Sequence, residues 1–210
     1  MVSLPRNDVE LARAALSGGA QGLKVHLNVH HHASGTHFGT WEEERAVLTE
    51  IVRLAGEVPV GVVPGGTPFA TGEEFAQMAE AGIDFFDAYP ADAPAWTLAQ
   101  NELDIMLAAY AGGTNAEIVA LQELGMTMCE ASIVPGDQYG EPLTTLDLAR
   151  YRELAGVLDA PIIVPSQKKI TPRDVAPLRA TGVKGLLIGA IVTGHDADSI
   201  EKATRAFAEL

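Results

Sequence analysis

Short apolar runs alternate with longer segments in which apolar residues recur at every third or fourth position. The runs are typical of buried β-strands, and the periodic segments are typical of amphipathic helices. Strands that alternate with helices predict a parallel sheet, and eight of them favour a compact (β/α)8 TIM barrel over a flavodoxin-like open sheet. The expected strands are Val2–Pro5, Leu23–Asn28, Pro59–Val63, Phe85–Tyr89, Ile105–Ala109, Met128–Val134, Ile162–Pro165 and Leu186–Val192.

Signals at the ends of the expected helices agree with this division. Thr40 precedes a Trp-Glu-Glu segment in a capping-box pattern, and Pro172 follows Thr171 at a first helical position. Glycines that suit a left-handed helix end follow four of the helix-like segments, at Gly19, Gly82, Gly125 and Gly182. Because no Ser/Gly-rich linker divides the chain, we expect residues 1–210 to form one TIM-barrel domain.

Each of these glycines begins a short repeated segment, the glycine phrase, that leads into a strand. Three of the four phrases carry a charged residue at the same distance from the glycine. The residues five positions after the glycines are Lys24, Asp87, Glu130 and Leu187. The phrases fall on the second, fourth, sixth and eighth strands, and alternate strands of such a barrel contribute to one interior layer. Because side chains alternate between the faces of a strand, one layer is expected to hold the three charges. The inward residues directly above them are His26, Tyr89 and Ser132.

A lysine beside two carboxylates predicts either a reaction centre or a buried ion cluster that only fills the barrel. Burial lowers the pKa of a lysine and nearby carboxylates raise it. Lys24, Asp87 and Glu130 are therefore candidates for general acid–base catalysis, with His26 assisting. A deprotonated Lys24 is the alternative, as the amine that forms a Schiff base with a carbonyl compound.

Active sites of this fold lie at the carboxyl ends of the strands. Side chains that point inward at these ends are expected to contact the substrate. In the second, fourth and sixth strands these side chains are Asn28, Tyr89 and Ser132.

Five of the six histidines lie between positions 26 and 37, in and after the second strand. Imidazole titrates near neutral pH and binds transition metals, so this loop predicts substrate contacts or a metal site. We expect His30 and His37 to bind the substrate. No cofactor is expected; the alternative is a divalent metal held by His26 or His30 together with Glu130.

The C-terminal part carries a pattern that is typical of anion binding. Ile170-Thr-Pro-Arg-Asp174 follows the seventh strand, and Gly189-Ala-Ile191 lies on the eighth. At these residues the chain resembles the phosphate-binding TIM-barrel superfamily, in which a glycine-rich turn and a short extra helix after strands seven and eight hold a phosphate. Gln167-Lys168-Lys169 replaces the glycine turn. The resemblance implies a small phosphorylated substrate, and the residues expected to hold its anion are Gln167, Lys168, Gly189 and Ala190.

The composition limits the classes of molecule that this protein is expected to bind. The formal net charge is −14, which disfavours nucleic acid and anionic membranes as general partners. No apolar run has the length of a membrane span, no signal segment opens the chain, and a single cysteine cannot form an internal disulfide. These features predict a cytoplasmic protein. They are compatible with assembly into a homo-oligomer.

The sequence therefore predicts an enzyme, a lyase or an isomerase or epimerase that acts on a small phosphorylated carbonyl or sugar compound. One alternative is a barrel that binds a metal or a metabolite without catalysis, with histidines as ligands. Another is a structural subunit whose ionic core is filler.

Overall fold

The computed structural model describes residues 1–210 and contains eight parallel strands that form a nearly closed barrel. In spatial order they are β1 (Val2–Ser3), β2 (Leu23–His26), β5 (Val60–Val63), β6 (Phe85–Ala88), β7 (Asp104–Tyr110), β8 (Met128–Ser132), β9 (Ile162–Pro165) and β10 (Gly185–Leu187). Val2 pairs with Ile188, and the Ser3 amide donates to the Ile188 carbonyl at 2.9 Å, so the edge strands β1 and β10 are also joined. The predicted (β/α)8 TIM barrel is confirmed.

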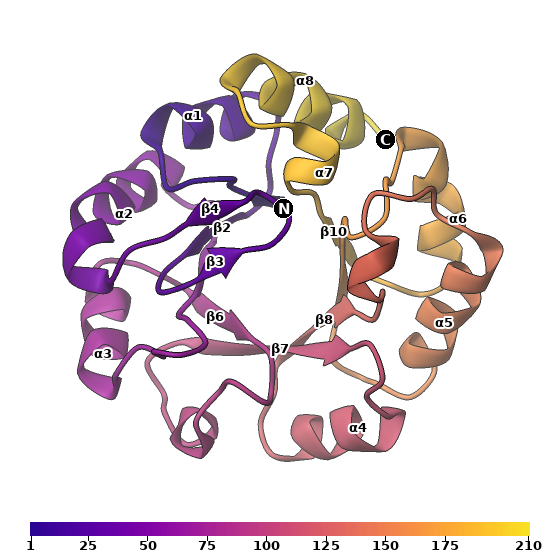
Figure 1. The fold of residues 1–210 in the computed structure, drawn as a ribbon, viewed down its shortest axis with the longest axis horizontal. Coiled ribbons are helices and arrows are strands. Elements are labelled where there is room, and N and C mark those ends of the chain that lie inside the picture. The colour runs from indigo at the N-terminus through magenta and orange to yellow at the C-terminus, as the bar shows by residue number, and fades with distance from the viewer.

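Helices surround the strands on the outside of the barrel (Figure 1). They are α1 (Val9–Ser17), α2 (Trp41–Ala55), α3 (Gly72–Glu80), α4 (Asn115–Glu123), α5 (Thr145–Ala155), α6 (Val175–Ala180), α7 (Ala190–Thr193) and α8 (Ala197–Ala208). A single 3₁₀ turn at Ala95–Leu98 stands in place of a helix between β6 and β7. The capping box predicted at Thr40 is present, and Pro172 begins a 3₁₀ turn, Pro172–Asp174, directly before α6.

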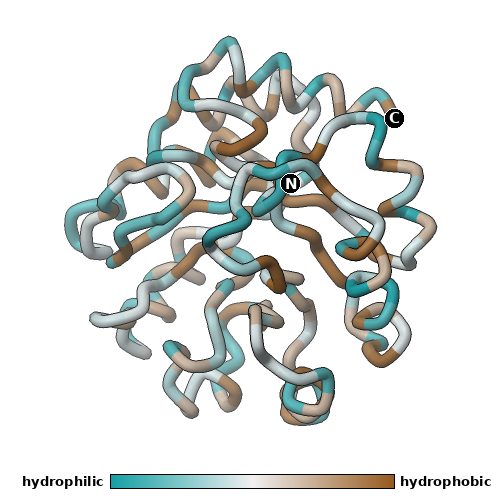
Figure 2. The backbone as a smooth tube through the Cα atoms, turned by 45° about the vertical axis from the view of Figure 1, so that its right-hand side comes forward, coloured by the Kyte–Doolittle hydropathy of each residue, from teal (hydrophilic) through white to brown (hydrophobic).

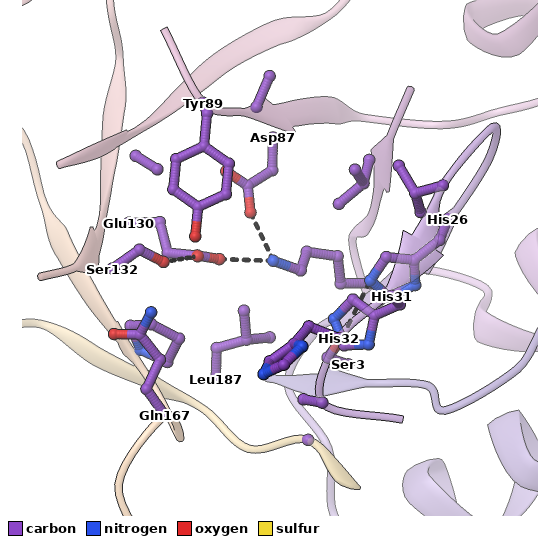
Figure 3. A pocket seen from close by; sticks show the side chains of 18 of the residues that line it. Ser3, His26, His31, His32, Asp87, Tyr89, Glu130, Ser132, Gln167 and Leu187 are labelled. Carbon is purple, nitrogen blue, oxygen red and sulfur yellow. Dashed lines mark hydrogen bonds and ion pairs between the residues drawn. The ribbon is translucent and has the colours of Figure 1, made fainter. Parts of the chain in front are cut away.

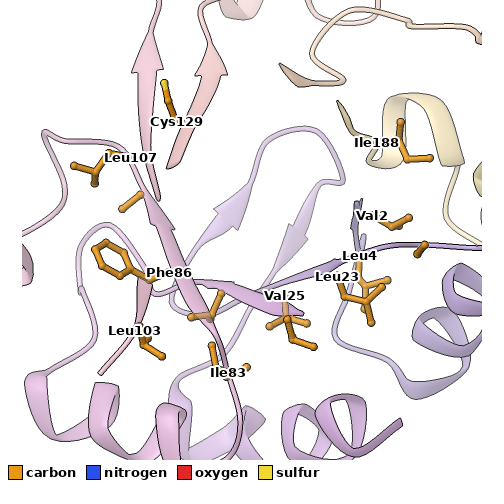
Figure 4. Close-up of a cluster of buried hydrophobic side chains, with 14 of the residues drawn as sticks. Val2, Leu4, Leu23, Val25, Ile83, Phe86, Leu103, Leu107, Cys129 and Ile188 are labelled. Atoms are coloured by element: carbon orange, nitrogen blue, oxygen red, sulfur yellow. The ribbon is translucent and has the colours of Figure 1, made fainter. Parts of the chain in front are cut away.

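The hydrophobic core lies between the sheet and the ring of helices. Outward side chains such as Val25, Phe86 and Cys129 are completely buried there (Figure 4). Hydrophobic residues follow the strands, whereas the helices alternate between hydrophobic and hydrophilic residues along each turn (Figure 2). None of the helices combines the length and hydropathy that crossing a membrane requires.

The amino-terminal end of the barrel interior is filled by apolar side chains. A Cβ atom at Gly61 would lie 2.1 Å from the Phe85 ring, and one at Gly185 would lie 2.8 Å from Ile163. The missing side chains of these glycines thus leave the space that Phe85 and Ile163 occupy. This plug leaves only the carboxyl ends of the strands open for a site.

The four glycines that open the repeated phrase all have the left-handed backbone that was predicted, with φ between 91° and 117°. Most strand ends differ from the prediction by one or two residues, and the end of the eighth strand differs by five. Two of these differences have a visible cause. The second strand stops at His26 because Asn28 adopts φ 54° and donates from its amide to the Pro64 carbonyl at 3.2 Å. The eighth strand stops at Leu187, and Gly189 begins the short helix α7 instead of continuing the strand to Val192.

Candidate active site

Three buried charges form the floor of a cavity at the carboxyl ends of the strands. Lys24 comes from β2, Asp87 from β6 and Glu130 from β8, as the repeated glycine phrase predicts. The Lys24 ammonium lies 2.5 Å from a carboxylate oxygen of Asp87 and 2.5 Å from one of Glu130 (Figure 3). Leu187 of β10 occupies the fourth position of the layer and is also buried. The structure therefore brings one lysine and two carboxylates together in one layer.

The protonation states of the three groups depend on one another. Burial alone would lower the pKa of Lys24, but the charges of Asp87 and Glu130 outweigh it and hold that pKa above its usual value. Burial and the neighbouring Glu130 charge raise the pKa of Asp87 well above the usual range. For Glu130, burial is outweighed by the Lys24 charge and by hydrogen bonds, which lower its pKa to about 2. The pKa values of the two carboxyl groups are therefore shifted in opposite directions, and Asp87 is the more easily protonated of the two.

The layer above the charges consists of polar and aromatic side chains. The Ser132 hydroxyl donates to Glu130 across a short contact. The His26 side chain is completely buried between His31 and Phe38, with ring centroids 4.5 and 4.7 Å away. Burial, followed by the charges of His31 and Lys24, lowers the pKa of His26 well below its usual value, so its imidazole is neutral. His26 Nδ1 has no hydrogen-bond partner within the protein.

Two loops form the rim above this layer. Strands β3 (His30–His31) and β4 (Thr36–His37) make a small antiparallel hairpin over the barrel (Figure 1). The ring of His32, in the turn of this hairpin, packs edge-on against Tyr139 of the loop after β8, with centroids 5.5 Å apart. The Tyr139 hydroxyl accepts a hydrogen bond from the Gln167 amide at 2.5 Å. The rim thus connects elements from both halves of the barrel.

The floor and rim enclose a cavity of about 310 Å³. Most of the residues predicted for the site line this cavity: Lys24, His26, His30, Asp87, Tyr89, Glu130, Ser132, Gln167, Gly189 and Ala190. Three of the predicted substrate contacts do not. Asn28 holds the loop after β5, as described above, and His37 is exposed on the hairpin strand β4. Lys168 is the third.

Lys168 is buried, but its ammonium is used in a structural contact. It lies 3.1 Å from a carboxylate oxygen of Glu141 and 3.2 Å from the side-chain oxygen of Gln138. The backbone reinforces this contact, since Gly140 donates to the Gln167 carbonyl and Lys169 donates to the Glu141 carbonyl. Residues 167–169 therefore anchor the loop after β8, and the Lys168 ammonium does not face the cavity.

The other part of the predicted anion site lies at the cavity wall. Gly189, Ala190 and Ile191 line the cavity at the start of α7, where the first amides of a helix have no intrahelical acceptor. The Ser166 hydroxyl, directly after β9, accepts from the Gly189 amide at 2.8 Å. Among the residues that line the cavity, Lys24 is the single lysine or arginine, and two carboxylates already neutralise it. The hydrogen-bond donors that this wall can offer to an anion are therefore uncharged groups.

No group of three or more His, Cys, Asp or Glu side chains is arranged to hold a metal ion. The metal alternative used His26 or His30 together with Glu130. His31 faces His26, while His30 and His37 are exposed.

The sequence analysis did not select several of the residues that line the cavity. Ser3, His31, Tyr139 and Ser166 all line the cavity. Ser3 and Ser166 had a usable signal, because each is at or just past the carboxyl end of a strand. His31 and Tyr139 lie in loops that follow the carboxyl ends of strands, but which side chains of these loops reach the cavity depends on how the loops fold over the barrel.

No protein-family model and no curated protein matches the sequence. The fold is similar to that of several solved structures. A thiamine phosphate pyrophosphorylase from Pyrococcus furiosus superposes with a TM-score of 0.71 at 18% identity, covering 99% of this chain and 92% of that one. KGPDC from Streptococcus mutans has a TM-score of 0.69 at 14% identity, covering 99% and 94%.

A mutant tryptophan synthase alpha-subunit from Pyrococcus furiosus has a TM-score of 0.78 at 12% identity, covering 100% of this chain and 96% of that one. At such identities the likeness concerns the fold, and one fold supports many functions. The chain therefore shares its (β/α)8 barrel fold with these three structures.

Proposed function

We propose that this protein is an enzyme that transfers protons on a small phosphorylated carbonyl or sugar compound, as a lyase or an isomerase. The observation that carries the proposal is the buried pair of Asp87 and Glu130, which share the Lys24 ammonium on the floor of an open cavity. Titratable groups with strongly shifted pKa values in a cavity are typical of catalytic sites.

The two carboxyl groups suit acid–base chemistry because their environments drive their pKa values apart. We assign Asp87, the more easily protonated carboxyl group, the role of the acid, and Glu130, whose pKa is lowered beside the ammonium, the role of the base. An ammonium has three hydrogens, of which Asp87 and Glu130 engage two. The third is available to a carbonyl oxygen of the substrate, whose developing negative charge it would stabilise.

The same geometry disfavours a Schiff base. An amine that attacks a carbonyl group must be unprotonated, which requires a lowered pKa. The two carboxylates raise the pKa of Lys24 instead. We therefore assign Lys24 the role of a charged hydrogen-bond donor.

The phosphorylated end of the substrate is placed at the wall made by Gly189, Ala190 and Ser166. Support comes from the free amides at the start of α7 and from the resemblance of this segment to phosphate-binding barrels. One structural neighbour is also named for a phosphorylated compound. Because the donors are neutral, we expect binding to respond to the shape of the phosphate group more than to ionic strength.

The test is hydrogen exchange at carbon. The protein is incubated in D2O with dihydroxyacetone phosphate, glyceraldehyde 3-phosphate and ribulose 5-phosphate, and loss of the C–H signal beside the carbonyl group is followed by NMR. Wild type should exchange at least one compound, and Glu130→Gln should reduce the rate at least about 10²-fold, the usual contribution of a general acid or base. Exchange that is unchanged in Glu130→Gln, or absent with the whole panel, contradicts the proposal.

Gly189→Ala tests the position of the phosphate. Gly189 has φ −131°, and the added Cβ would meet nothing closer than Ser3 Cβ at 3.5 Å, so the fold should tolerate the methyl group. The methyl group would occupy the wall proposed for the phosphate. Weaker binding of inorganic phosphate in a thermal-shift titration, at an unchanged melting temperature of the free protein, supports this position, and equal binding places the anion elsewhere.

One observation favours a second candidate, a barrel that binds a metabolite without catalysis. All three charges on the floor are satisfied by one another, as a structural ion cluster requires. Stabilisation by a phosphorylated compound that shows no carbon-bound exchange would support this candidate over the enzyme.

A further inference from the structure

Ser3 stands between the charged floor of the cavity and the wall proposed for the phosphate. On one side it pairs in register with Lys24 of the neighbouring strand β2. On the other side its Cβ lies 3.5 Å from the position that a Cβ atom of Gly189 would take. Ser3 is buried and lines the cavity. A ligand that contacts both the floor and the wall therefore lies within reach of the Ser3 hydroxyl.

Ser3 also contacts a buried histidine of the next strand. Its hydroxyl oxygen lies 3.5 Å from His26 Nε2 (Figure 3), and His26 Nδ1 has no partner. A neutral imidazole carries its proton on one nitrogen only. Because a buried N–H group without an acceptor is rarer in proteins than a buried acceptor without a donor, we assign the proton to Nε2. The imidazole then donates a hydrogen bond to the Ser3 oxygen.

The direction of this hydrogen bond determines what the Ser3 hydroxyl can offer to a ligand. A serine hydroxyl has one hydrogen to donate and two lone pairs that accept. His26 occupies a lone pair, and the Ser3 side chain has no other hydrogen bond within the protein. The hydroxyl hydrogen of Ser3 is consequently free to be donated into the cavity.

Ser166 repeats this arrangement on another side of Gly189. Its hydroxyl oxygen accepts from the Gly189 amide at 2.8 Å and lies 3.9 Å from the same Cβ position. Ser166 is also buried and lines the cavity. Because the Ser166 oxygen acts as an acceptor, its hydrogen is free as well. Two hydroxyl hydrogens are therefore available beside the space that Gly189 leaves by lacking a side chain.

We propose that Ser3 binds the phosphate group of the substrate and that His26 positions the Ser3 hydroxyl for this contact. The inference rests on the proposed function, because it uses the placement of the phosphate against Gly189. Hydroxyl donors suit this wall because the lysine that lines the cavity, Lys24, is already paired with two carboxylates. His26 does not contact the ligand in this arrangement and is a positioning residue that acts through Ser3.

The tautomer of His26 can be measured without a ligand. A long-range ¹H–¹⁵N NMR spectrum distinguishes the two neutral forms of imidazole, and the signals absent from His26→Leu identify this residue. We expect the protonated nitrogen of His26 to be Nε2. A proton on Nδ1 would overturn the positioning role, because Ser3 would then donate its hydrogen to His26 and have none left for a phosphate.

Ser3→Ala tests the contact with phosphate. In a thermal-shift titration with inorganic phosphate, this variant should have a dissociation constant at least about tenfold higher than wild type, as expected for the loss of a hydrogen bond to a charged group. Ser17→Ala is the matched control and should bind as wild type does, because Ser17 is exposed at the end of α1. Equal binding by Ser3→Ala and wild type would overturn the inference.

A double variant separates positioning from general damage to the cavity. His26→Leu removes both nitrogens and keeps a side chain of similar volume, and it should weaken phosphate binding at least about twofold. In the Ser3→Ala background the same substitution should have no further effect, because no hydroxyl is left to position. An equal loss in both backgrounds would contradict the positioning role, because His26 would then support the cavity in another way.

The inference and the proposed function fail separately. If Gly189→Ala weakens phosphate binding and Ser3→Ala does not, the phosphate is correctly placed and the role of Ser3 is wrong. If neither variant changes the binding, or wild type binds no phosphate, the placement of the phosphate and the role of Ser3 are both wrong. The exchange of carbon-bound hydrogen still decides whether the floor transfers protons.

Discussion

Two lysines in this protein are both buried but have different surroundings. The side chain of Lys24 is 7% exposed and that of Lys168 is 3% exposed. Lys24 lies among two enclosed carboxylates on the floor of a cavity, whereas Lys168 pairs with Glu141, whose side chain is 58% exposed. Burial of a lysine is therefore a poor indicator of a site. The direction of its ammonium, toward the cavity or toward a loop, decides whether chemistry is possible.

Replacing Lys24 should have the largest effect on stability. Lys24→Met leaves two buried carboxyl groups without a countercharge, which costs about 3–5 kcal/mol when one partner of a buried pair is removed. In this variant burial and mutual repulsion raise both carboxyl pKa values in the folded state. The stability that remains should thus be present at acidic pH and lost as the pH rises through those values.

Urea denaturation of Lys24→Met at pH 5 and pH 8 measures this difference. Lys24→Met that is as stable as wild type at pH 8 would mean that water reaches the cluster freely, contrary to the enclosed floor.

A smaller effect is expected from the histidines above the floor. Burial, followed by the Lys24 charge, lowers the pKa of His31 to about 4, and the pKa of His26 is also lowered. As the pH falls below the unfolded value of about 6.5, the unfolded chain takes up protons that the folded chain does not bind. Wild type should therefore lose stability from pH 7 to pH 5.

His31→Gln should make this loss shallower when the free energy of unfolding is measured at several pH values. His195→Gln, in the exposed segment between α7 and α8, provides the comparison. An equal slope in wild type and His31→Gln would show that the hairpin does not keep His31 enclosed.

The smallest effect is expected at the second lysine. Lys168→Met removes a pair in which Glu141 is already half in water, so the loss should be about 1 kcal/mol. Lys169→Met is the matched control, because Lys169 is the exposed neighbour. Equal melting temperatures of the two variants would indicate that Lys168 does not hold the loop after β8. A loss as large as that of Lys24→Met would remove the contrast between the two lysines.

Much of the fold was predictable because it depends on periodicities. The alternation of strands and helices, the inward layer of charges and the left-handed glycines follow from the strand period of two and from the steric freedom of glycine. Strand ends were less predictable, because they depend on contacts with distant segments. Asn28 leaves the extended conformation and donates to the Pro64 carbonyl, and Gly189, which donates to the Ser166 hydroxyl, is the N-cap of α7.

The sequence by itself determined the barrel and the placement of Lys24, Asp87 and Glu130 in one layer. Local patterns suffice for these, since neighbours along a strand decide which face a side chain takes. Only the tertiary structure decided that Lys168 serves a loop, that His31 turns inward onto His26, and that Tyr139 reaches Gln167. Those contacts join loops that are far apart in the chain, and their geometry depends on packing over the closed barrel, which no local pattern encodes.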